Sequence, residues 1–169
     1  MNTITATAHF MTRHELLLVT AESCTAGLIA SHLADVPGAG HLLDCAFVAY
    51  SESAKQHCLG VKEETIRQHG LTSEEVAREM ALGALRNSRA NLAISNTGVA
   101  DDSGDGTPAG TQCYAWAFQT HQRLDQVAVF TETRRFDGDR NAVREAGAVY
   151  ALLRVPHYYE QLASVAAPE

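Results

Sequence analysis

Short apolar runs alternate with segments of helical periodicity along this chain, and that alternation constrains the fold more than any other feature. Residues 16–20, 45–50 and 92–95 are short and largely apolar, which is typical of strands that helices cover on both faces. Residues 112–120 and 126–133 follow each other across a short polar segment, which predicts a hairpin and therefore an antiparallel strand. The whole pattern predicts a layered α/β domain around a mostly parallel sheet of about five strands.

One helix has a clear start in the sequence. Thr72 can cap it, and Glu75 three residues later completes a capping box. The apolar side chains that follow recur at helical spacing. They predict one buried face, made of Val76, Ala77, Met80, Ala81, Ala84 and Leu85.

A second long helix is predicted to begin after an Asp139 cap. Its predicted inner face consists of Ala142, Val143, Ala146, Val149, Tyr150 and Leu153. Pro156 is expected to stop or kink this helix, because proline lacks a backbone donor and clashes with the preceding turn. We expect the residues after Leu162 to fray.

Size and composition predict one domain over residues 1–169, with a core over about 12–155. At 169 residues and 46% hydrophobic content, the chain can bury one sizeable core. No internal repeat, low-complexity tract or linker divides it. The longest apolar runs are far shorter than the roughly 18 residues that span a bilayer, and the first residues lack the apolar segment of a signal peptide. We therefore expect a cytoplasmic protein without a membrane partner.

The charges and the cysteines argue against two classes of function. A net charge of −7 disfavours a nucleic-acid-binding surface, because such surfaces need clustered lysine and arginine. Any nucleotide partner is therefore expected to be a small molecule. The four cysteines show neither CxxC pairing nor metal-finger spacing with the histidines. We expect reduced thiols and no metal or other cofactor.

Polar clusters follow three of the predicted strands, at residues 21–25, 51–55 and 96–100. Parallel strands would bring these clusters to one edge of the sheet, where ligands of open α/β proteins bind. Ser23 would then stand at the start of a helix, with the amides of Cys24 and Thr25 free to face an oxyanion. The simpler alternative is that Ser23 only caps that helix.

Lys55 lies on the same predicted edge and offers chemistry for Ser23. A lysine whose burial lowers its pKa toward neutrality can act as a general base, and a Ser/Lys pair can activate a hydroxyl without histidine. An ordinary solvated lysine is the alternative. Tyr50 could orient the lysine or donate to a substrate, or it could be a half-buried core residue. Thr97 and Gly98 could bring a hydroxyl and a close backbone to a ligand, or they could form a simple turn.

Two other segments are candidates for holding an anion. Residues 101–111 are rich in glycine, and such loops can bind phosphate through backbone amides. The segment lacks the lysine of a P-loop and contains three aspartates, so an ordinary surface loop is favoured. Arg140 and Arg144 are four residues apart near a helix start and would share one helical face. They could clamp a phosphate or carboxylate, or they could form a solvated, salt-bridged surface.

Five blocks occur in a specific order: TAESCTAGLIASHLADVPGAG, FVAYSESAKQHCLGV, HGLTSEEVAREMALGA, TGVA and FDGDRNAVREAGAVYALL. Together they resemble the C-terminal domain of the competence/damage-inducible protein A (CinA) family, over residues 12–153. The resemblance implies a three-layer α/β/α domain with a mixed sheet, which associates into a homo-oligomer. It also implies an enzyme that converts nicotinamide mononucleotide to nicotinate mononucleotide and ammonia, without a metal.

Residue by residue, the resemblance implies Ser23 as the nucleophile and Lys55 as its base, with Tyr50 beside them. It implies substrate-binding roles for Thr97 and Arg140, which stand in the family's TG and GDR motifs. The helix-start amides would stabilise the oxyanion, and Arg140 with its neighbour Arg144 would hold the 5′-phosphate.

Three positions depart from the family pattern. Ala26 stands in place of a glycine, Glu52 in place of an asparagine, and the loop at 101–111 lacks a Lys-Pro pair and has gained acidic residues. Carboxylates in that loop would repel a substrate phosphate by about 1 kcal/mol per close pair. The sequence therefore leaves three functions open. The chain could be a Ser/Lys amidase, a catalytically altered paralogue that binds a nucleotide as a regulatory module, or an amidase that acts on a less phosphorylated amide.

Overall fold

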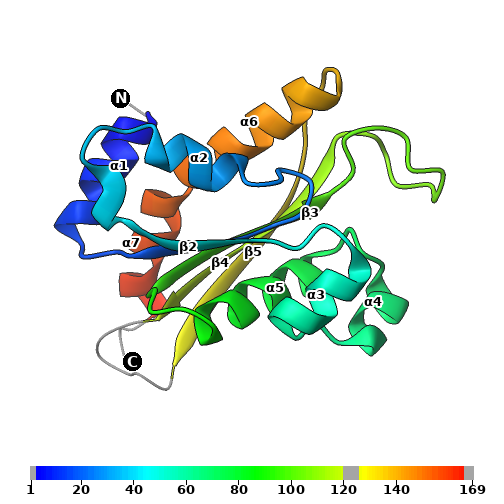
Figure 1. Cartoon of the computed structure of the whole chain (residues 1–169), viewed down its shortest axis with the longest axis horizontal. Coiled ribbons are helices and arrows are strands. Elements are labelled where there is room, and N and C mark those ends of the chain that lie inside the picture. Colours follow the sequence, from blue (N-terminus) through cyan, green and yellow to red (C-terminus); the bar gives the residue numbers. More distant parts are fainter. Residues whose placement is uncertain (1–2, 120–125, 166–169) are drawn as a thin grey trace.

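The computed structural model describes residues 3–119 and 126–165, with side chains up to residue 162. Its centre is a five-stranded sheet in the order β2-β1-β3-β4-β5 (Figure 1). The strands are β1 (Leu18–Glu22), β2 (Leu43–Val48), β3 (Leu92–Gly98), β4 (Thr111–Gln119) and β5 (Val127–Arg135). β1 is parallel to β2 and β3, whereas β4 is antiparallel to β3 and β5. The mixed sheet and the hairpin are therefore confirmed, and the predicted connection at 121–125 lies outside the described residues.

Helices cover both faces of the sheet, which confirms the three-layer α/β/α architecture (Figure 1). They are α1 (Ile4–Arg13), α2 (Leu28–Ala34), α3 (Glu52–Leu59), α4 (Glu63–His69), α5 (Glu74–Arg86), α6 (Arg140–Leu153) and α7 (Val155–Val165), with a 3-10 turn η1 (Ala39–His41). α1, α2, α6 and α7 lie on one face, and α3, α4 and α5 lie on the other. None of the described helices is long and apolar enough to cross a membrane.

Alternating side chains of the strands build a separate core on each face of the sheet. β4 shows the reason most clearly. Tyr114, Trp116 and Phe118 fill the core on the side of α6 and α7, whereas Ala115 and Ala117 face the opposite core and let α5 approach closely. The two faces of β4 thus differ in side-chain size.

The strands that carry the polar edge differ in their limits from the prediction. β1 and β3 run on through Glu22 and Gly98 instead of ending at residues 20 and 95, because the polar residues near their ends are buried. Glu22 lies opposite Asn96 in the parallel register. β2 is an edge strand whose side chains are half-buried or exposed, so the prediction that helices cover residues 45–50 on both faces is wrong. The carboxyl ends of β1, β2 and β3 meet at one edge, as expected.

α5 has the predicted buried face, since all six of the predicted apolar residues are buried. Its cap differs from the prediction. Ser73, rather than Thr72, has extended backbone angles and accepts a hydrogen bond from Val76 N at 3.3 Å. The cap therefore lies one residue later than predicted, and the predicted capping box with Glu75 is wrong, because the third residue after Ser73 is Val76.

α6 begins after the predicted Asp139 cap, but its buried face is rotated from the predicted one. The buried residues are Val143, Gly147, Ala148, Ala151 and Leu152. Small residues on this face let α6 lie close to β4, where Tyr114 and Trp116 donate hydrogen bonds to its carbonyl groups. Ala142 and Ala146, which were predicted to face inward, are exposed.

Pro156 lies in the first turn of α7, and Arg154 separates α6 from α7, which confirms the predicted break. α7 continues to residue 165, so the predicted fraying after Leu162 is wrong for residues 163–165, and residues 166–169 lie outside the described part of the chain. α3 and α4 were not predicted. They bury only Lys55, Leu59 and Ile66, so no apolar stripe marks them in the sequence.

Candidate active site

A buried carboxylate organises the turn that follows β1. Glu22 is fully buried. Its two oxygens accept hydrogen bonds from Thr25 Oγ1 (2.7 Å), Gly27 N (2.9 Å), Ile29 N (3.1 Å) and Ala30 N (3.0 Å). Three of these donors are backbone N–H groups at the start of α2, which would otherwise lack partners. Glu22 therefore caps α2, and the alternative that Ser23 caps this helix is wrong.

Glu22→Gln is expected to lower the free energy of unfolding by about 3 kcal/mol, because the amide nitrogen would face a buried N–H that has no other partner. Glu74→Gln is the matched control. Glu74 accepts hydrogen bonds from the hydroxyls of Thr131 and Thr133, at 2.6 and 2.8 Å. A hydroxyl can rotate to accept instead, so we expect a loss below about 1 kcal/mol. Urea unfolding measures both losses, and equal values would contradict the capping role of Glu22.

Ala26, which stands in place of a glycine of the family pattern, occupies the strained position of the same turn. Ala26 has a φ of +47° and Gly27 a φ of +95°, so both residues lie in the left-handed region. A Cβ in that region costs about 1 kcal/mol, which a glycine avoids. The alanine therefore makes the turn costlier without changing its hydrogen bonds.

Ser23 and Lys55 meet at the carboxyl edge of the sheet. Lys55 lies on α3, and its Nζ donates to Ser23 Oγ at 2.8 Å. Both side chains are buried, with 1% of Lys55 and 7% of Ser23 exposed. Burial lowers the pKa of Lys55 from 10.5 to about 8, and the nearby charge of Glu52 opposes that shift. The alternative of a solvated lysine is wrong.

The remaining contacts of Lys55 determine how the pair can move a proton. Nζ also donates to the carbonyl oxygens of Ala49 and Tyr50, at 3.0 Å each. A neutral amine has two N–H donors and one lone pair. With both donors on these carbonyls, the lone pair faces Ser23 Oγ. The neutral form of Lys55 is therefore oriented to accept the serine proton.

Fewer backbone amides near Ser23 are free to donate to an oxyanion than the sequence suggests. The amide of Thr25 donates to Asn96 Oδ1 at 3.1 Å, so the expectation that it is free to face an oxyanion is wrong. The amide of Cys24 has no hydrogen-bond partner among the residues that the structure describes. It is the donor adjacent to Ser23 that remains available for an oxyanion.

Two buried amide side chains hold this turn from β3 and β4. Asn96 donates through Nδ2 to Gln112 Oε1 at 2.8 Å, and Gln112 Nε2 donates to Cys24 Sγ at 3.4 Å. Burial raises the pKa of the Cys24 thiol, which keeps it protonated and unreactive near neutral pH. Glu22 and Asn96 belong to the polar clusters visible in the sequence, but their residue types do not reveal burial. Gln112 carries no sequence signal at all.

Arg140 opens α6 and reaches across the same edge. Its Nη2 donates to the Tyr50 hydroxyl at 2.8 Å and its Nη1 to Asp101 Oδ2 at 2.7 Å. Asp101 begins the acidic loop 101–110, which projects past the sheet beside the start of α6 (Figure 1). Tyr50 is 55% exposed, so the core alternative is wrong. Its hydroxyl contacts Arg140 and its carbonyl contacts Lys55, so Tyr50 links the two cations.

Arg144 holds the turn after β1. Its Nε donates to the Cys24 carbonyl oxygen at 2.9 Å, and its Nη2 lies 3.5 Å from the Thr25 carbonyl oxygen. Arg140 and Arg144 both reach the carboxyl edge of the sheet from the first turns of α6. Their contacts differ, because Arg140 binds side chains at the surface, whereas Arg144 binds two backbone carbonyls and, at 3.4 Å, Asn141 Oδ1.

The acidic loop binds its own backbone. Asp102 accepts a hydrogen bond from Gly104 N at 2.9 Å, and Asp105 accepts one from Thr107 N at 2.8 Å. Carboxylates of the loop therefore occupy amides that a phosphate would need, as in the ordinary surface loop favoured by the sequence. No cluster of three or more His, Cys, Asp or Glu side chains in the described residues could hold a metal ion.

Thr97 and Gly98 lie within β3, so the alternative of a simple turn is wrong. Thr97 Oγ1 donates to the Leu71 carbonyl oxygen at 2.8 Å. A Cβ on Gly98 would lie 2.5 Å from the Thr111 carbonyl oxygen, so the pairing of β3 with β4 requires glycine there. The structure brings Ser23, Lys55, Tyr50 and Arg140 together through direct contacts. Thr97 and Gly98 instead have structural roles in β3.

Comparison with known proteins places the chain among relatives of one family. A model of the CinA C-terminal domain family matches residues 2–159 of the chain. A protein of Escherichia coli strain K12 named nicotinamide-nucleotide amidohydrolase PncC is 41% identical over 137 residues, which are 80% of this chain and 79% of that protein. A competence-damage inducible protein of Symbiobacterium thermophilum is 42% identical over 158 residues, which are 90% of this chain but only 37% of that longer protein.

Solved structures show the same likeness. A CinA superfamily protein of Escherichia coli superposes with a TM-score of 0.82 at 30% identity, covering 93% of this chain and 91% of that chain. A competence/damage-inducible protein of Agrobacterium tumefaciens gives a TM-score of 0.79 at 34% identity, covering 92% of this chain and 95% of that chain.

Proposed function

This chain belongs to the CinA C-terminal domain family, and from that premise we propose that it hydrolyses the carboxamide of nicotinamide mononucleotide to nicotinate mononucleotide and ammonia. The observation that carries the proposal is the buried 2.8 Å contact between Lys55 Nζ and Ser23 Oγ. A serine hydroxyl beside a buried amine is the pairing that lets an amidase form an acyl-enzyme without histidine. The name of the Escherichia coli relative supports the choice of substrate.

Acylation begins with the neutral form of Lys55. Its lone pair takes the proton of Ser23 Oγ while that oxygen attacks the carboxamide carbon. The negative charge that develops on the carboxamide oxygen is stabilised by the unpaired amide of Cys24. The lysine then gives its proton to the nitrogen of the leaving group, the C–N bond breaks, and ammonia departs.

Deacylation repeats the same proton movements with water. Neutral Lys55 takes a proton from a water molecule, whose oxygen attacks the acyl carbon. The proton returns to Ser23 Oγ as the C–O bond of the acyl-enzyme breaks, and the carboxylic acid that forms releases its remaining proton to solvent and leaves as the carboxylate. The contacts of Lys55 with the carbonyls of Ala49 and Tyr50 hold the amine in one place through both half-reactions.

Arg140 is the group that we assign to the 5′-phosphate of the substrate. It lies at the surface of the same edge, and Tyr50 holds it close to the Ser23–Lys55 pair. Its second contact is with Asp101, whose carboxylate occupies the guanidinium as a phosphate would. Substrate binding must therefore displace Asp101, which gives the acidic loop a direct effect on KM.

Ammonia release from nicotinamide mononucleotide and nicotinamide riboside separates the phosphate contact from the chemistry. Arg140→Gln is expected to raise KM for the mononucleotide at least about tenfold, since a charge-assisted contact is worth about 1.4 kcal/mol or more, and to leave KM for the riboside unchanged. Asp101→Asn is expected to lower KM for the mononucleotide severalfold, because it removes the competing carboxylate.

The control for these variants is Arg67→Gln on α4, because Arg67 is exposed and pairs only with Glu64 among the described residues. It should change neither KM. An equal rise in KM for both substrates with Arg140→Gln would contradict the phosphate assignment.

A nucleotide-binding regulatory module is the second candidate function. The acidic loop favours it, because its departure from the family pattern changes the surroundings of Arg140 while the fold is kept. The same substrates distinguish the two functions. Thermal stabilisation by the mononucleotide without any ammonia release would support the regulatory module and contradict hydrolysis.

A further inference from the structure

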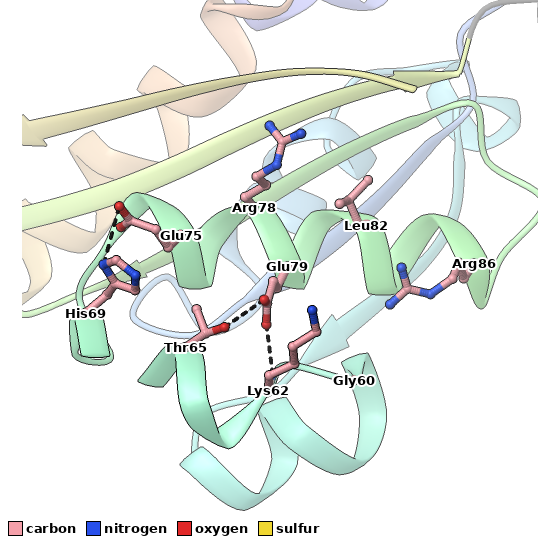
Figure 2. Close-up of a pocket in the computed structure, with 9 residues that line it drawn as sticks. All are labelled: Gly60, Lys62, Thr65, His69, Glu75, Arg78, Glu79, Leu82 and Arg86. Carbon is pink, nitrogen blue, oxygen red and sulfur yellow. Dashed lines mark hydrogen bonds and ion pairs between the residues drawn. The ribbon is translucent and has the colours of Figure 1, made fainter. Parts of the chain in front are cut away.

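A groove of about 440 Å³ lies between α5 and α4, together with the segment that joins α3 to α4. Figure 2 shows it, with one face of α5 along its length and Lys62 on the facing segment. Its lining residues are Gly60, Lys62, Thr65, His69, Glu75, Arg78, Glu79, Leu82 and Arg86. None of them belongs to the Ser23 site, so the groove requires its own explanation.

The groove has more positive charge than its carboxylates can neutralise. Glu79 accepts hydrogen bonds from Lys62 N at 2.8 Å and Thr65 Oγ1 at 2.7 Å, so both of its oxygens are engaged. Glu75 lies against His69. Within the described residues, no carboxylate contacts the side chains of the three cations that line the groove, Lys62, Arg78 and Arg86. In a chain whose net charge is −7, this is a local reversal of sign.

Two of these cations are directed at one space. In Figure 2, the ammonium group of Lys62 and the guanidinium group of Arg86 both point into the groove from opposite sides, while Arg78 extends away from them. Arg86 has one long contact, 3.5 Å from Nη2 to the Leu59 carbonyl oxygen at the end of α3. That contact leaves most of its donors open to the groove.

Gly60, the residue that follows α3, has a φ of +70° and lines the groove beside Arg86. Leu82 lines the groove beside the cations as a partly buried apolar surface.

We propose that this groove binds a small molecule through a phosphate monoester group, with Arg86 and Lys62 as its ligands. Lys62 and Arg86 form no ion pair with the described residues, and a guanidinium can bind phosphate oxygens with two parallel hydrogen bonds. Like charges that share one hollow repel each other, and an anion between them removes that repulsion. A carboxylate would neutralise only one of the two.

The test is a titration of the isotopically labelled protein with inorganic phosphate, followed by NMR at constant ionic strength. Amide shifts are expected at Gly60, Lys62 and Arg86. Lys62→Gln and Arg86→Gln should each weaken phosphate binding at these amides at least about tenfold, whereas Arg67→Gln on α4 should leave it unchanged. Lys62→Gln is the safer variant for folding, because the Lys62 side chain is exposed and forms no hydrogen bond or ion pair with the described residues.

Phosphate is also expected to bind at Arg140, and its neighbouring amides report that event separately. Arg140→Gln should remove only those shifts, so failure at the groove and failure at the Ser23 site are distinguishable. Shifts confined to the surroundings of Arg140 would overturn the proposal. An equal loss of affinity with Arg67→Gln, or equal shifts with acetate in place of phosphate, would overturn it as well.

Discussion

Replacing Lys55 with methionine is expected to lower kcat for amide hydrolysis by about 10³-fold or more while the protein stays folded. Methionine fills a similar volume and has no basic nitrogen, so Ser23 loses the group that takes its proton. The carbonyls of Ala49 and Tyr50 lose a donor, but the buried charge disappears as well. Ammonia release under saturating substrate measures kcat, and circular dichroism checks the fold. A kcat within tenfold of that of the parent protein would contradict the role of Lys55 as base.

The pKa of Lys55 also sets the pH dependence of the parent protein. Only the neutral amine can accept the serine proton, so kcat should rise with pH through about 8 and level off above it. The pH profile of the residual activity of Lys55→Met should lack this rise. A parent profile that stays flat between about pH 7 and 9 would contradict the assignment.

The same pKa has a consequence for stability, with a definite sign. The pKa of Lys55 is about 8 in the folded protein against an ordinary value of 10.5, so the unfolded chain binds more protons between these two values. The burial of Lys55 therefore destabilises the folded state. This destabilisation is complete below pH 8, decreases as the pH rises toward 10.5, and is absent above that pH. The stability of Lys55→Met relative to the parent protein should fall over that range. Urea unfolding at several pH values measures the difference.

The layers of the fold could be predicted because they depend on hydrophobic pattern. The three apolar runs that became β1, β2 and β3 and the stripe of α5 are features that a sequence displays directly. α3 could not be predicted in this way. It is short and buries only Lys55 and Leu59, so its position depends on Gly83 of α5, where a Cβ would lie 1.9 Å from the Leu59 carbonyl oxygen. Close backbone packing of this kind has no sequence period.

The candidate site could be predicted in part, because the rule for parallel strands brings the polar ends of β1, β2 and β3 together. The resemblance then singled out Ser23 and Lys55 among those polar residues. Glu22, Asn96 and Gln112 could not be predicted, since buried polar residues at strand ends look the same in sequence as solvated loop residues. Only the hydrogen bonds of the folded chain show that they build the turn around Ser23.

The loss of ammonia release in Ser23→Ala is the second large effect that the proposed mechanism predicts. Ser23 Oγ is the only atom of the side chain that alanine lacks, and Glu22, not Ser23, caps α2. The substitution should therefore leave the turn and the fold intact. Removal of the nucleophile from an acyl-enzyme mechanism is expected to lower kcat by about 10³-fold or more. Ser53→Ala is the matched control, since Ser53 is an exposed serine on α3.

The rate of ammonia release from nicotinamide mononucleotide by the parent protein, Ser23→Ala and Ser53→Ala tests the central claim most directly. We predict equal rates for the parent protein and Ser53→Ala, and a rate at least about 10³-fold lower for Ser23→Ala with an unchanged circular dichroism spectrum. Ammonia release by Ser23→Ala at the rate of the parent protein would contradict the claim that Ser23 is the nucleophile.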